Sequence, residues 1–133
     1  MGTAEKVLIV GGVSILSYGF LLGIPLSMIR MKSPQAPRYL ITAHLAAIIQ
    51  GALLLGLSRA TQLSDLSPTL ETTAAALFVV GVSFFVVGAT LDWLQNIGDH
   101  FAERSLGWKL LAISGPINIS AAAIFLVGVS RGV

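Results

Sequence analysis

The sequence predicts an all-α integral membrane protein, a bundle of four transmembrane helices joined by short loops. First, 55% of the 133 residues are hydrophobic and only 11% are charged, against roughly 25% charged residues in an ordinary soluble domain. Second, the mean hydropathy is +0.87. Third, the apolar residues form four runs, each close to the roughly 20 residues that cross a bilayer as a helix. We therefore expect residues 1–133 to form one domain in contact with a lipid bilayer.

The first span is predicted over residues 7–29. This run is longer than the apolar segment of a signal peptide, which has about 7–15 residues, and Arg30 and Lys32 follow it directly. We therefore expect a retained helix. Pro34 and Pro37 prevent the helix from continuing, and the second span is predicted over residues 39–57.

The third span is predicted over residues 72–97. Its apolar run ends at Leu91, but Asp92, Asn96 and His100 then follow at intervals of four residues, a spacing that places them on one face of a continuing helix. The fourth span is predicted over residues 110–129. It contains Asn118, which we expect to bond the carbonyl group freed by Pro116.

The basic residues stand at the ends of these spans. Five lie on the side of the two odd-numbered loops and three on the side of the termini: Arg30, Lys32, Arg38, Arg104 and Lys109 against Lys6, Arg59 and Arg131. The positive-inside rule then predicts that both termini are outside, and we expect a multi-pass protein of a bacterial inner membrane. The net charge is only +2 and no basic cluster occurs, so no nucleic-acid partner is expected.

His44 is the first candidate site residue. It lies about five residues into the second span, where an ionisable group is costly and is a functional hypothesis by default. Ala47 and Gly51 leave a shallow surface near the imidazole, and Gln50 adds a second polar group about 9 Å further along the helix. With no cysteine in the chain, histidine and carboxylate are the strong metal ligands left. The residues alone leave two interpretations open, a metal or cofactor ligand and a hydrogen bond to a neighbouring helix.

The second candidate region follows the third span. The loop before the second span and the loop after the third span lie on the same side of the membrane. His44, near the start of the second span, is therefore expected at the same depth as Asp92, Asn96 and His100. These side chains either line a site in that leaflet or lie on a helix that emerges into water.

Two segments resemble one known family. Residues 43–51 read Ala-His-Leu-Ala-Ala-Ile-Ile-Gln-Gly and resemble the second span of the styrene oxide isomerase and hydroxylaminobenzene mutase family, where the pattern is Ala-His, five residues, then Asn-Gly. Residues 92–101 read Asp-Trp-Leu-Gln-Asn-Ile-Gly-Asp-His-Phe and resemble the family's third span, in which a tryptophan and an Asn-x-Gly step precede an aromatic stretch.

The resemblance implies a haem b between neighbouring subunits of a homotrimer, with His44 as the axial ligand of the iron and Ala47 and Gly51 beside the cofactor. Without a thiolate ligand the iron is not tuned for oxygen activation, and its open face would act as a Lewis acid. The implied reaction is an internal rearrangement of a small apolar aromatic substrate, either an aryl epoxide to an aldehyde or an arylhydroxylamine to an aminophenol.

The resemblance further implies that Gln50, Asn96 and His100 are catalytic residues that line the substrate pocket. Two of them depart from the family's pattern: Gln50 replaces an asparagine, and His100 stands where the isomerases have a tyrosine. His100 is therefore also a candidate second iron ligand. Two other functions remain open, a bis-histidine haem protein that transfers electrons through His44 and His100, and a haem-free structural membrane subunit.

Overall fold

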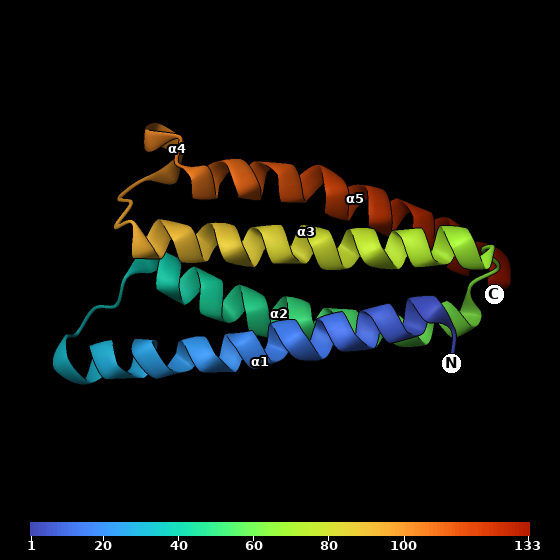
Figure 1. The fold of residues 1–133 in the computed structure, drawn as a ribbon, viewed down its shortest axis with the longest axis horizontal. Coiled ribbons are helices and arrows are strands. Elements are labelled where there is room, and N and C mark those ends of the chain that lie inside the picture. Colours follow the sequence, from blue (N-terminus) through green and yellow to red (C-terminus); the bar gives the residue numbers. More distant parts are fainter.

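The computed structural model describes residues 1–133 and confirms the predicted fold class. Four long helices lie along one another, and both termini are at the same end of the bundle (Figure 1). In chain order the helices are α1 (Thr3–Lys32), α2 (Arg38–Ala60), the 3-10 helix η1 (Thr61–Leu63), α3 (Pro68–Leu94), the short α4 (His100–Glu103) and α5 (Leu106–Gly132). All four long helices are long and apolar enough to cross a membrane.

Two helices begin where a serine caps them. The Ser67 hydroxyl accepts a hydrogen bond from Leu70 N at 3.4 Å, and Pro68 occupies the first turn of α3, where its missing N–H costs nothing. The Ser105 hydroxyl accepts from Trp108 N at 3.0 Å and starts α5. These caps place the helix starts before the apolar runs, so α3 and α5 extend beyond the predicted spans at their N-terminal ends.

The end of α3 differs from the prediction. The helix ends at Leu94 instead of continuing to residue 97 and beyond. Asn96 has a φ of 52°, in the left-handed region, which asparagine tolerates better than most residues. The chain therefore turns, and Asp99 caps the separate helix α4. Asp92, Asn96 and His100 do not form one helical stripe.

Helix α3 is the centre of the bundle. It packs against α1, α2 and α5, while α5 packs chiefly against α3. Glycines permit the closest approaches: Gly12 lies against Gly51 between α1 and α2, and Gly88 lies against Gly107 between α3 and α5. Such small residues let membrane helices approach backbone to backbone.

Gly107 gives a direct test of the α3–α5 contact. A Cβ atom there would overlap the Gly88 carbonyl oxygen and the Asp92 carboxylate, and a backbone atom cannot move aside easily. We expect Gly107→Ala to destabilise the protein by about 1–3 kcal/mol, as overpacking commonly does. The control is Gly115→Ala on the same helix, where a Cβ meets no atom within 4 Å. Thermal unfolding in detergent should show a lower midpoint for Gly107→Ala alone; equal midpoints would contradict the contact.

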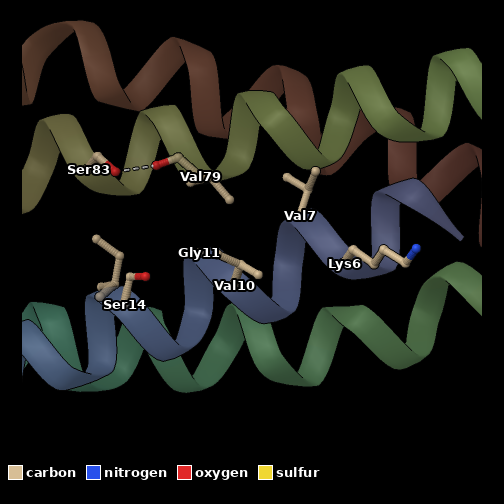
Figure 2. A pocket seen from close by; sticks show the side chains of 8 residues that line it. Lys6, Val7, Val10, Gly11, Ser14, Val79 and Ser83 are labelled. Carbon is tan, nitrogen blue, oxygen red and sulfur yellow. Dashed lines mark hydrogen bonds between the residues drawn. The ribbon is translucent and has the colours of Figure 1, made fainter. Parts of the chain in front are cut away.

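Two hollows lie along the sides of the bundle. One, of about 530 Å³, runs between α1 and α3, and Ser14 and Ser83 lie on its two walls (Figure 2). The other, which we call the α2–α5 valley, has a volume of about 590 Å³ and is lined by nine apolar residues, among them Leu57 of α2, Phe78 of α3 and Ile119 of α5.

Candidate functional site

The His44 imidazole is held by α1. Its Nδ1 lies 2.7 Å from the Gly19 carbonyl oxygen. Because a carbonyl oxygen only accepts, Nδ1 carries the proton and donates, which leaves Nε2 with its lone pair. Gly23, one turn further along α1, makes room for the ring, since a Cβ there would lie 3.3 Å from His44 Cε1.

The Nε2 atom of His44 is open. The structure gives it no hydrogen bond, and it is not one of the buried nitrogen and oxygen atoms that lack a partner. It therefore reaches the surface of the bundle, where the exposed side chains of Ile41 and Leu45 lie nearby on α2. The sequence left two interpretations open for His44. The hydrogen bond to a neighbouring helix is present, and it leaves the other ring nitrogen, Nε2, free.

Ala47 and Gly51 lie in the contact between α1 and α2. Ala47 is fully buried beside Gly19, and Gly51 faces the backbone of Leu16. Both residues help to hold α1 close enough for the Gly19 carbonyl to reach His44. Their predicted place beside a cofactor stays a prediction.

Gln50 faces another side of α2. It follows His44 by six residues, which places it about 120° around the helix axis at about 100° per residue. Its Oε1 atom is buried and has no hydrogen-bond partner. His44 and Gln50 of one chain therefore do not face one common space.

His100 belongs to a polar cluster at the loop end of the bundle. Its Nδ1 lies 3.0 Å from Asp92 Oδ2, and the Ser105 hydroxyl donates to Asp92 Oδ1 at 2.6 Å. The backbone N–H of His100 donates to the Tyr39 hydroxyl at 2.9 Å, and the two rings stack with centroids 4.8 Å apart. Asp92 is 0% exposed and His100 is 7% exposed.

The cluster fixes the orientation of His100. Because Nδ1 donates to the carboxylate, Nε2 is again the nitrogen with the lone pair. Tyr39, on which the ring stacks, precedes His44 by five residues, about 140° around α2. The two histidines of one chain therefore lie on different sides of this helix, although they lie at the same end of the bundle.

Asn96 lies beside this cluster. Its side chain is exposed, and it lines a cavity of about 200 Å³ together with Tyr39, Asp92 and Trp93. The structure thus brings together Asp92, Asn96 and the His100 region, as the sequence predicted, but through a turn and not through helical spacing.

Three participants were not identified from the sequence: Gly19, Tyr39 and Ser105. Ser105 carries the one usable signal, since a serine before an apolar helical run is a typical N-cap. Gly19 acts through its backbone, and Tyr39 depends on where α4 lies, so neither leaves a local pattern.

Comparisons with models of protein families, with curated proteins and with solved structures find no match to this chain. Function is therefore inferred from the geometry of His44 and the Asp92–His100 cluster, together with the two segments that resemble the isomerase and mutase family.

Proposed function

We propose that this chain is a haem b-dependent membrane isomerase or mutase that rearranges a small apolar aromatic substrate, similar to the styrene oxide isomerases and hydroxylaminobenzene mutases. The observation that carries the proposal is the state of His44. Its Nδ1–H is bonded to the Gly19 carbonyl, and its Nε2 is free at an apolar surface.

This state suits an axial ligand. A histidine that binds a metal commonly donates its other ring N–H to a carboxylate or a backbone carbonyl, which fixes the tautomer and the ring orientation. His44 would hold the haem through Nε2, and the exposed Ile41 and Leu45 would contact the apolar ring system. When bound, the haem would supply an iron with one open face as a Lewis acid.

The other proposed site residues would orient the substrate. Gln50 offers both an amide donor and a carbonyl acceptor. Asn96 and His100 lie at the loop end of the bundle, where His100 keeps Nε2 free because Asp92 holds Nδ1. Since Gln50 and His100 lie on a different side of α2 from His44, a homotrimer with the haem between subunits accounts for how they act at one site.

The test is the visible absorption spectrum of the purified protein, ferric and then reduced, expressed with haem available. We expect a haem spectrum in the wild type that shifts on addition of cyanide or imidazole, because one face of the iron is open. His44→Ala should lose the spectrum. His100→Ala, the matched control, should keep it.

Each other outcome has a meaning. A colourless wild type would contradict the proposal and leave a structural membrane subunit. A spectrum that ignores added ligands and changes in His100→Ala would indicate the bis-histidine electron carrier instead.

A further inference from the structure

The hollow between α1 and α3 has a cation at one end and two small hydroxyl side chains at the other (Figure 2). Lys6 is the only charged residue that lines it. The other lining residues are apolar or small, among them Val10 of α1 and Val79 of α3. A mostly apolar cavity with a polar group at a defined place is the general form of a ligand site.

The hollow runs through about one leaflet of a bilayer. Lys6 directly precedes the apolar run that begins at Val7, so its ammonium group lies at the level of the lipid headgroups, where lysines at helix ends place their charge. Ser14 follows Lys6 by eight residues, about 12 Å along the helix. Half of a hydrocarbon core about 30 Å thick is about 15 Å. The hollow therefore extends from the headgroups almost to the bilayer midplane.

Small residues keep the hollow open. Gly11 is buried and lies directly against Val79, where a Cβ atom would overlap the valine side chain, and this contact forms the floor. Beside it, Ser14 and Ser83 end in single hydroxyl groups. The Ser83 hydroxyl donates to the Val79 carbonyl oxygen of its own helix at 2.7 Å, so it needs no hydrogen bond from an occupant.

The Lys6 ammonium group has no carboxylate partner. The structure holds one ion pair, which lies at the other end of the bundle. Glu5, the neighbour of Lys6, accepts from Gln62 Nε2 of η1 at 3.2 Å, and neither Glu5 nor Glu71 at the start of α3 lines the hollow. An unpaired cation at headgroup depth attracts anionic lipids.

We propose that this hollow binds one anionic phospholipid, with an acyl chain along Val10 and Gly11 and the phosphate against Lys6. The ammonium group donates charge-assisted hydrogen bonds to the phosphate oxygens, and the acyl chain covers the apolar walls. A headgroup that carries its own cation binds less tightly, because that cation is repelled by Lys6 and offsets the charge of the phosphate.

The dimensions favour an acyl chain over a helix of another protein. A volume of about 530 Å³ over about 12 Å gives a mean cross-section of roughly 44 Å². An α-helix about 10 Å across needs roughly 80 Å², so only its side chains could enter. A flexible acyl chain can follow the whole hollow, and the lipid also brings the negative charge that complements Lys6.

The lipid site is separate from the site proposed for haem and does not depend on it. His44 lies near the start of α2, at the loop end of the bundle, whereas Lys6 lies near the start of α1, at the end that holds both termini (Figure 1). A lipid bound between α1 and α3 stabilises the folded state by mass action.

Native mass spectrometry of the delipidated full chain in detergent tests the proposal. Titration with phosphatidylglycerol and with phosphatidylcholine of the same acyl chains should show one site that prefers the anionic lipid by about fivefold or more, the effect of one lysine near an anionic lipid. Lys6→Gln should remove this preference. Arg131→Gln should keep it, because Arg131 is an exposed cation at the same end of the bundle that does not line the hollow.

A second pair of variants fills the hollow instead of removing its charge. Ser14 is exposed at the rim, so Ser14→Trp should fold, and its indole should displace the acyl chain and abolish the site. Ser17→Trp, on the same helix and equally exposed but outside the hollow, should keep it. Equal affinity for the two lipids, an equal loss in Lys6→Gln and Arg131→Gln, or a site that survives Ser14→Trp would overturn the proposal.

Discussion

Replacing Asp92 with alanine should destabilise the protein by about 3 kcal/mol or more. The Asp92 carboxylate is fully buried and accepts from both His100 Nδ1 and the Ser105 hydroxyl. Removing it leaves both donors without their acceptor, and each hydrogen bond to a charged group contributes about 1.5–3 kcal/mol. Because Ser105 also caps α5, the effect should reach the start of that helix. Unfolding by heat or by sodium dodecyl sulfate, followed by circular dichroism, measures the loss.

Asp99→Ala is the control for this effect. It removes the same charge at the same end of the bundle, but Asp99 is exposed and only caps the short helix α4, through Phe101 N and Ala102 N. The loss of an exposed cap costs about 1 kcal/mol. Similar losses in the two variants would show that the Asp92 cluster does not stabilise the fold.

The fold was predictable because the hydropathy of the four long apolar runs dominates it. Four apolar runs in a chain with 11% charged residues have only one stable arrangement in a bilayer, the helix with all its backbone groups bonded. The pairing of the helices was not predictable in the same way. It depends on where glycines such as Gly12 and Gly88 let two backbones meet, and glycine is common in membrane helices in any case.

The prediction that the third helix continues past Leu94 was wrong because it relied on a four-residue spacing of polar side chains. Asp92, Asn96 and His100 are spaced like one face of a helix, but Asn96, Gly98 and Asp99 are typical turn residues. The local turn chemistry outweighed the spacing. Asp92 and His100 nevertheless meet, because the turn folds α4 back over the end of the helix.

The site was only partly predictable, because several of its contacts depend on how two helices pack together. His44 stood out as a lone histidine in an apolar run, but its Gly19 partner depends on the register between α1 and α2. The expectation for Asn118 was wrong: it makes no hydrogen bond to the carbonyl freed by Pro116, and instead its amide packs on Gly81. Contacts of this kind are set by the packing of two helices, which neither helix encodes alone.

The proposed homotrimer predicts that two inactive variants restore each other. If each site takes His44 from one copy and Gln50 from the next, then neither His44→Ala nor Gln50→Ala alone has a complete site. In rings formed from equal amounts of the two chains, about a quarter of the interfaces should join an intact His44 to an intact Gln50. Activity on an aryl epoxide or an arylhydroxylamine, measured by chromatography of the product, should then rise to about a quarter of that of the wild type.

The control places His44→Ala in both chains, which should abolish the recovery because no interface then has an intact His44. A site built within one chain gives a different result, since every chain in the mixture lacks one of the two residues. The mixture would then show only the mean of the two separate activities, and the shared site would be excluded. The experiment therefore distinguishes a site between copies from a site within one copy by a change from background activity to a defined fraction, whichever of the two substrate classes the protein uses.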